Sequence, residues 1–467
     1  MLDFVIFAAT FLTALLIATI YFYPGSRRVT RIPGPEPTTK EDGNLSDIAR
    51  AGSLHQYLMM LHKQYGDITA FWMGQELVVS ICSPELFKQH ASVFDRPPSL
   101  FELFKPLLGE KSPQYANKAD GRKRRKCYDS VLAHDYLHHY YPAIQEISDN
   151  LVKKWSTIAK DEHIPLAQYM NGFSLKVVLV SLFGNKAWSD EQILEFIHQH
   201  DIVWGEMERR LTDFPEEGSS RIKAFEEAKN RMLELFKKII KNPKKLKDAD
   251  EYLFIDALLD STTDKDQIFS DVITYVIGGY HTTGNLLTWA VYFLATYQDI
   301  QDKVYKEIRK VLGKEDVNPK SAKDLVYLNQ VIDETLRCAI VAPWAARYQD
   351  IDSELGGHKI PKNTPVIHAL GVSLQNGKYY PVPNKFDPDR FSPENKKSRP
   401  TLAFQPFGFA GKRMCPAYKF AYAEAIIGLA TLLRKFKIRM VEGQVVTPVY
   451  GYVTHPKDEI WVEIEKR

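Results

Sequence analysis

The chain has 467 residues, of which 45% are hydrophobic and 12% aromatic, so it can bury a large core. Its formal net charge of +3 is close to neutral and gives no electrostatic case for binding nucleic acid. The four cysteines, Cys82, Cys127, Cys338 and Cys415, have no paired spacing. The composition therefore argues against a disulfide framework or a zinc site, and it fits a reducing cytosolic environment.

The first hydrophobic segment, Phe4 to Tyr23, contains no charged residue. A helix needs about 20 such residues to cross a bilayer. Asp3 precedes the segment and Arg27 and Arg28 follow it, and positive charge favours the cytosolic side. A cleaved signal peptide would have its positive charge first and a small-residue cleavage site, and this segment has neither. We therefore predict that residues 1–26 form an uncleaved signal-anchor, with the body of the protein in the cytosol.

Residues 27–40 are rich in proline and predict a stiff hinge between the anchor and the body. No linker divides residues 41–467, which we interpret as one large domain. Its pattern of charged and apolar residues is mostly helical, and the predicted fold class is mainly α with a small β region. The predicted strands are Ile68 to Met73, Leu77 to Cys82, Ala345 to Ile351, Thr364 to Val372 and the tail from Ile438 to Ile464.

A loop near the C-terminus, Phe407 to Pro416, combines one cysteine with basic residues. A thiolate needs nearby positive charge to stay ionised, and as a haem ligand it pushes electron density that favours O–O cleavage. Gly411 would let the loop bend tightly, and the guanidinium of Arg413 suits a haem propionate. A lone cysteine is more often a buried, inert residue. The interpretation of Cys415 as an iron ligand therefore depends on two further patterns.

The second pattern lies in a long apolar run, Gln267 to Tyr297, which predicts a helix. Gly278 and Gly279 in its middle each cost a helix roughly 1 kcal/mol relative to alanine. A flat cofactor pressed against the backbone would explain them. Thr282 and Thr283 can bond to helix carbonyls and open the helix locally. The alternative is a kinked core helix with tolerated polar residues.

The third pattern is a charge pair, Glu334 and Arg337, on one face of a predicted helix. Most such pairs are solvated and contribute little. Arg390, in the proline-punctuated turn Phe386 to Phe391, would complete a Glu–Arg–Arg network.

In this order and spacing, the three patterns resemble the cytochrome P450 superfamily of haem-thiolate monooxygenases over essentially the whole chain. Within it, Met1 to Phe4, Asp42 to Leu45, Gly52 to His55 and Val441 to Val445 are similar to family twenty, subfamily A, of animals. The resemblance implies the cytochrome P450 fold for the large domain. It also implies haem b as the cofactor, with Cys415 as the ligand of its iron.

The resemblance further implies roles for individual residues. Thr282 would organise proton delivery, and His281 would either join that relay or point away and bond a carbonyl. The implied cofactor contacts are Cys415, Arg413, Gly411, Phe407, Arg347 and Gly279, with the Arg124–Arg125 pair as a further candidate for the propionates. The residues implied at the substrate pocket are Tyr280, Trp344 and Tyr450.

The chain also departs from the family pattern. One extra residue stands between Phe407 and the cysteine, and Ala417 replaces the usual glycine. His281 replaces the usual acid, and the usual tryptophan before the basic run Arg122 to Lys126 is absent. The cysteine, the arginines and Thr282 are kept, so haem binding is still expected, whereas the rate and coupling of oxygen activation depend on these changes.

The function implied is a monooxygenase that inserts one oxygen atom from O2 into an apolar small molecule. The chain has no flavin or nicotinamide fingerprint, so electrons would come from NADPH through cytochrome P450 reductase, with cytochrome b5 as a candidate second donor. The expected location is the endoplasmic reticulum membrane, with a single span. Two alternatives stay open: a haem-thiolate enzyme that rearranges peroxides, and a non-enzymatic haem sensor or carrier.

Overall fold

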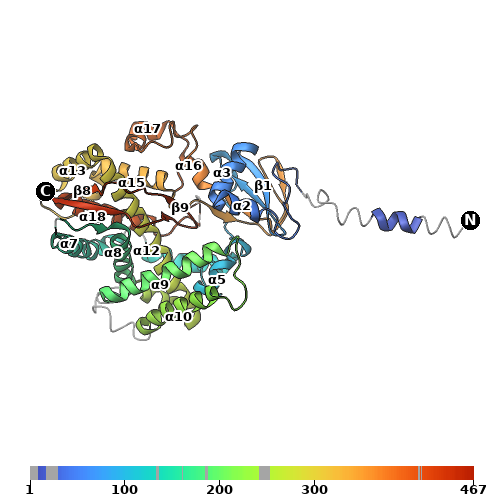
Figure 1. Ribbon diagram of the computed structural model, residues 1–467, viewed down its shortest axis with the longest axis horizontal. Coiled ribbons are helices and arrows are strands. Elements are labelled where there is room, and N and C mark those ends of the chain that lie inside the picture. The colour runs from blue at the N-terminus through green and yellow to red at the C-terminus, as the bar shows by residue number, and fades with distance from the viewer. Residues whose placement is uncertain are drawn as a thin grey trace, which may run out of the picture.

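The computed structural model describes residues 9–16, 30–132, 136–159, 161–184, 188–240, 253–408, 411 and 413–467. Most of the body is helical, and a smaller lobe carries β1 with α2 and α3 beside it (Figure 1). The predicted class, mainly helical with small β sheets, is confirmed.

The larger helices form the helical part of the body. They are α6 (Lys118–Val131), α7 (Tyr141–Ser156), α8 (Leu166–Phe183), α9 (Asp190–Arg209), α10 (Ser220–Ile240), α12 (Lys265–Thr296), α13 (Gln298–Leu312), α15 (Val326–Ala339) and α18 (Tyr418–Lys435). The shorter α-helices are α2 (Leu45–Ala51), α3 (Leu54–Tyr65), α4 (Pro84–Gln89), α5 (Lys105–Leu108), α11 (Phe254–Ser261), α14 (Ser321–Asp324), α16 (Leu370–Leu374) and α17 (Pro393–Lys397). Short 3-10 turns are η2 (Ser99–Phe104), η3 (Leu137–Tyr140), η5 (Pro388–Phe391) and η6 (Thr401–Ala403).

A mixed sheet with the order β1-β2-β7-β4 forms the smaller lobe. Its strands are β1 (Ile68–Met73), β2 (Glu76–Ile81), β4 (Ala345–Arg347) and β7 (Val366–His368). The predicted β1–β2 hairpin is confirmed, and β2 continues parallel to β7. The predicted strand from Ala345 to Ile351 is shorter than expected, and the run from Thr364 to Val372 divides into β7 and α16.

Three smaller sheets complete the β structure. They are β3 (Ile164–Pro165) with β11 (Trp461–Lys466) and β8 (Phe436–Met440), β9 (Pro448–Tyr450) with β10 (Thr454–Pro456), and β5 (Ser353–Leu355) with β6 (His358–Ile360). The C-terminal tail thus supplies the strands that the sequence predicted there.

The core is organised around α12, which has 32 residues and contacts α8, α15 and α18. Among the described residues one helix, α8, is long and apolar enough to cross a membrane, with a mean hydropathy of 1.3. Its window is 67% buried, and it packs against α7, α9 and α12, so it is a core helix of the domain.

The predicted anchor, residues 1–26, lies largely outside the described residues. Within it, residues 9–16 are helical and exposed. The proline-rich segment that follows is docked on the sheet from Ile32 onward. Ile32 is 2% exposed, the carbonyl of Pro33 accepts the Ala70 N–H at 2.9 Å, and a Cβ on Gly34 would overlap the Ala70 carbonyl. A pivot between anchor and body therefore has to lie before Ile32.

Candidate functional site

The cysteine loop is closed by two backbone hydrogen bonds. The Cys415 N–H donates to the Phe407 carbonyl at 3.0 Å, and the Met414 N–H donates to the Gly411 carbonyl at 3.1 Å. Gly411 has φ +109°, and a Cβ there would lie 2.6 Å from the carbonyl oxygen of Ala91. Glycine is therefore required on both conformational and steric grounds. Phe409, Ala410 and Lys412 lie outside the described residues.

Phe407 joins this loop to α18. Its ring lies 5.3 Å from the ring of Tyr422 and 6.0 Å from that of Tyr418. The Tyr422 hydroxyl in turn donates to the Asp333 carboxylate on α15. The position of the loop is thus set by packing on the helix that follows it.

Three guanidinium groups gather beside the loop: those of Arg347 on β4, Arg413 in the loop and Arg96 after α4. Arg347 is 2% and Arg413 8% exposed, and the Nε atoms of these two side chains have no hydrogen-bond partner among the residues that the structure describes. Arg347 Nη2 approaches the Arg413 carbonyl oxygen at 3.5 Å, and Arg413 lies over the ring of Phe94 at 4.4 Å. Within the described part of the chain, none of the three makes an ion pair with a carboxylate.

Burial is the main cause that lowers the pKa of Arg413 to about 8, that of Arg347 to about 9 and that of Arg96 to about 10. Neighbouring guanidiniums lower these pKa values further: Arg96 acts on Arg347 and Arg413, and Arg125 acts on all three. Positive charges buried together are costly unless negative charge is supplied to them. A group with two carboxylates fits this need, and the two propionates of haem are such a group. Sequence reasoning missed Arg96, because no local pattern distinguishes it from other arginines in loops.

Arg124 and Arg125, the further candidates for the propionates, have different partners. Arg124 Nη2 donates to Asp271 Oδ1 on α12 at 2.6 Å, and the Tyr128 hydroxyl donates to the same oxygen at 3.0 Å. Arg124 is therefore engaged in a buried structural contact and is not free for a propionate. Arg125 pairs with Asp129 at 2.7 Å, yet its charge acts on Cys415 and on Arg347.

The surroundings of Cys415 favour the neutral thiol over the thiolate. Burial raises its pKa, although the backbone N–H of Ala417 and the charges of Arg125 and Arg96 act in the opposite direction. A metal cation bound here would deprotonate the thiol that coordinates it.

The two glycines of α12 face in different directions. A Cβ on Gly279 would meet Val178 Cγ2 of α8 at 2.8 Å, so this glycine permits close packing of α12 on α8. A Cβ on Gly278 would have no heavy atom of the described residues within 4 Å. The open face of the helix is therefore at Gly278, whereas the sequence had indicated Gly279. The Thr282 hydroxyl donates to the Gly278 carbonyl at 2.7 Å and thus lies on this open face.

His281 lies on another face of α12, among aromatic rings of α9. Its ring centroid is 4.7 Å from His200 and 4.9 Å from Trp204, and its Nδ1 has no hydrogen-bond partner among the described residues. Burial, reinforced by His200 and His455, holds its pKa well below the usual value. The imidazole is therefore neutral at physiological pH. Tyr280 is also buried against α9, with its ring 5.7 Å from Phe196.

The predicted Glu–Arg–Arg network is present. Glu334 and Arg337 are fully buried, with Arg337 Nε 2.6 Å from Glu334 Oε2, and Arg390 Nε is 3.4 Å from Glu334 Oε1. The Asp387 N–H donates to Glu334 Oε1 at 2.8 Å. Arg337 also donates to the carbonyls of Leu374 and Lys385. The network therefore ties α15 to the meandering segment before the cysteine loop.

This combination of a helical body, a cysteine loop and a buried Glu–Arg–Arg network defines a class of protein. The sequence model of the family described as Cytochrome P450 matches residues 33–461, and the chain belongs to that family. Membership implies a haem cofactor, a redox partner and, in general, monooxygenase activity.

Particular relatives match over the full length. Cytochrome P450 20A1 from Bos taurus is 37% identical over 468 residues, and its namesake from Homo sapiens is 35% identical over 468 residues. Both alignments cover 100% of this chain and 100% of the relative. Cytochrome P450 6a9 from Drosophila melanogaster is 35% identical over 209 residues, covering 43% of this chain and 41% of the relative. The predicted resemblance to family twenty, subfamily A, is confirmed.

Proposed function

We propose that the protein is a haem-thiolate monooxygenase, with haem b held between the open face of α12 and the cysteine loop. The observation that carries this proposal is the group of guanidiniums beside Cys415, two of them buried, that forms no ion pair with a carboxylate among the described residues. The Cys415 sulfur would bind the iron, and Arg347, Arg413 and Arg96 would bind the propionates. When bound, haem supplies the activation of O2.

Proton delivery is assigned to Thr282. Its hydroxyl donates to the Gly278 carbonyl, which leaves the oxygen lone pairs able to accept a hydrogen bond from a water on the open face. His281 fits the alternative role of a packing residue, because a neutral, buried ring among aromatic neighbours is poorly placed to exchange protons with solvent. The departure from the usual acid at this position therefore alters packing against α9.

The proposed substrate is an apolar small molecule, because aromatic rings from separate segments meet beside the His281 face of α12, next to its open face. Phe101 stacks on Trp344 at 5.7 Å, and Phe104 meets Tyr452 at 4.4 Å and Trp204 at 5.3 Å. Trp204 also contacts His281, so this wall reaches α12. Of the residues first expected at the pocket, Trp344 belongs to the wall, whereas Tyr450 packs on His55, with ring centroids 5.0 Å apart.

Electrons are proposed to come from NADPH–cytochrome P450 reductase, with cytochrome b5 as a second donor. A groove of about 720 Å³ on the outer side of α15 and α18 carries Lys323, Lys396 and Lys419. Basic residues beside the helix that follows Cys415 suit an acidic electron-transfer partner. We also propose the single N-terminal span and the endoplasmic reticulum as the location, from the charge pattern of residues 1–26.

The test of the haem-thiolate assignment is spectroscopic. The reduced, CO-bound protein should show the red-shifted Soret band of thiolate-ligated haem, and Cys415→Ser should lose it. A variant with an unchanged spectrum would remove Cys415 from the iron. Turnover with NADPH and reductase, compared with turnover on a hydroperoxide alone, separates a monooxygenase from a peroxide-rearranging enzyme, and a haem sensor would show neither.

A further inference from the structure

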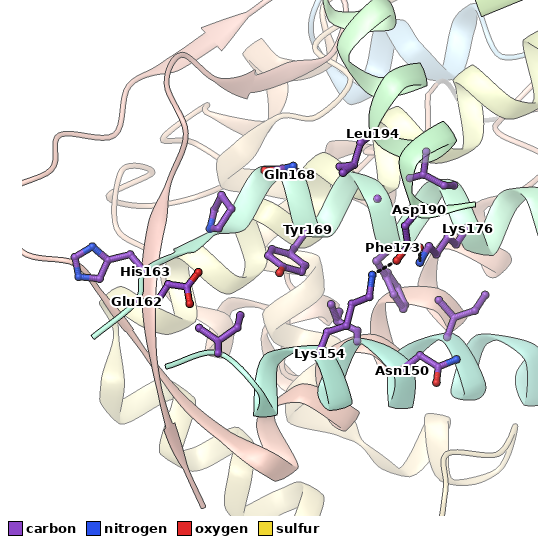
Figure 2. Close-up of a pocket in the computed structure, with 16 residues that line it drawn as sticks. Asn150, Lys154, Glu162, His163, Gln168, Tyr169, Phe173, Lys176, Asp190 and Leu194 are labelled. Atoms are coloured by element: carbon purple, nitrogen blue, oxygen red, sulfur yellow. Dashed lines mark hydrogen bonds and ion pairs between the residues drawn. The ribbon is translucent and has the colours of Figure 1, made fainter. Parts of the chain in front are cut away.

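A second cavity lies away from the proposed haem site, between α7, α8 and the first turn of α9 (Figure 2). Its volume of about 320 Å³ is within the range of small-molecule sites. Phe173 and Ile193 form a buried floor, and Ile158 and Tyr169 are half-buried. Leu194 is 44% exposed beside it. The cavity thus leaves a patch of apolar surface that no described side chain covers.

One end of this cavity carries positive charge. Lys154 of α7 and Lys176 of α8 both bind the carboxylate of Asp190, at the start of α9 (Figure 2). Because two ammonium groups share one carboxylate, the three side chains together carry a net charge of +1. The side chains are 48%, 31% and 49% exposed, and ion pairs this accessible are worth little. Both lysines are therefore available to share a second carboxylate.

The opposite end of the cavity carries an acidic side chain and a histidine. Glu162 and His163 lie there, at the end of the cavity away from the lysines (Figure 2). His163 Nε2 is 3.4 Å from Glu463 Oε1. The carboxylate of Glu162 disfavours a ligand anion at this end, so the charge distribution gives a bound anion one orientation.

The backbone of α8 leaves room for a ligand at Gly172. Among the described residues, a Cβ on Gly172 would have only Ile193 Cγ2 within 4 Å, at 3.8 Å, which is ordinary van der Waals contact. Glycine inside a helix is destabilising relative to alanine, and no neighbouring side chain requires it here. The empty space over Gly172 is therefore unexplained by the packing of the helix.

We propose that this cavity binds an amphipathic monoanion, a hydrocarbon chain ending in one carboxylate. The carboxylate lies between Lys154 and Lys176, and the chain runs over Gly172 and Tyr169 towards Ile158. The site is separate from the substrate wall on α12, and it does not rest on the proposed monooxygenase function.

The test uses dodecanoate that carries a diazirine near its middle, photolysed with the haem-loaded full-length protein in detergent. Excess 4-phenylimidazole keeps the haem pocket filled. Mass spectrometry should place saturable labels on peptides from α7, α8 and the start of α9. Gly172→Leu fills the space, and Lys154→Met with Lys176→Met removes the charge. Each should raise the half-saturating concentration at least tenfold.

Matched controls separate binding from damage to the fold. Lys153→Met, on the same turn of α7 but outside the cavity, should leave the labelling unchanged. Gly172→Ala, which favours the helix, should weaken labelling less than Gly172→Leu does. The corresponding diazirine alcohol should bind more weakly and be indifferent to loss of the lysines. Labelling that does not saturate, or that survives Gly172→Leu in a variant with a native circular dichroism spectrum, overturns the proposal.

Discussion

At the scale of single residues, the helix after the cysteine loop contains an acid that the proposed chemistry does not use. Glu424 on α18 is fully buried, and neither carboxylate oxygen makes a hydrogen bond of good geometry among the described residues. Burial raises its pKa from 4.5 to about 8, against the opposing effect of the Ser174 hydroxyl. The side chain is therefore neutral at pH 7, which removes the cost of burying a charge.

Glu424 should make the stability of the protein depend on pH. Below about 4.5 both the folded and the unfolded chain carry the proton. Between about 4.5 and about 8 the unfolded chain releases it first, so stability falls as pH rises, in total by roughly 3–5 kcal/mol. Glu424→Gln should match the wild type at pH 5 and be more stable at pH 8.5. Thermal unfolding followed by circular dichroism measures this, with the exposed Glu442→Gln as control. A variant with an unchanged pH dependence contradicts the prediction.

Gly411 and Gly408 form a matched pair in the cysteine loop. Both have positive φ, so alanine at either position costs about 1–3 kcal/mol in backbone strain. At Gly411 the new Cβ also meets the Ala91 carbonyl oxygen at 2.6 Å, whereas at Gly408 no heavy atom of the described part of the chain lies within 4 Å of it. Gly411→Ala should therefore retain much less haem per protein than Gly408→Ala, as measured by absorbance after purification. Equal haem content in the two variants would contradict this prediction, since it would mean that the loop moves enough to avoid the contact with the Ala91 carbonyl oxygen.

At the scale of elements, the geometry of α12 decides several of the residue roles. One face packs on α8 at Gly279, a second meets α9 at His281, and a third stays open at Gly278. Asp271 fixes the start of this helix to α6 through Arg124. These contacts hold the open face of the helix in place.

The contributions of Arg124 on α6 and Asp271 on α12 to the free energy of unfolding should depend on each other. Arg124→Met leaves the buried Asp271 with the Tyr128 hydroxyl but without its counter-charge, and should cost about 3–5 kcal/mol of stability. Asp271→Asn in the same chain removes the orphaned charge and should restore part of this loss. Chemical unfolding of the two single variants and the double variant measures the coupling. Additive effects in the double variant would mean that the two side chains do not interact.

At the scale of the whole molecule, we expect that the predicted membrane segment can be deleted without damage to the catalytic domain only if the deletion ends before Ile32. Deleting residues 2–29 should release much of the protein from microsomes while preserving the CO-bound Soret band. Deleting residues 2–36 also removes Ile32, Pro33 and Gly34 from the β1 surface, and should lower stability and haem content. Fractionation and absorbance spectra test both. A full-length protein found only in the soluble fraction would exclude the anchor.

The sequence by itself determined the helical class, the β1–β2 hairpin and the pairing of Glu334 with Arg337, although not the burial of that pair. Each follows from spacing within one segment, and local spacing survives whatever the segment packs against. It also pointed to the cysteine loop, because glycine and basic residues around one sulfur are a local pattern.

Only the tertiary structure decided which residue of each motif faces which neighbour. Successive helical residues point about 100° apart, so Gly278, Gly279 and His281 reach three different surroundings from one short segment. The joining of Arg96 and Arg347 to the loop, and the engagement of Arg124 by Asp271, depend on contacts between distant parts of the chain. The cavity over Gly172 also depends on tertiary contacts. Its walls come from α7, α8 and α9, and the sequence of any one of these helices does not predict it.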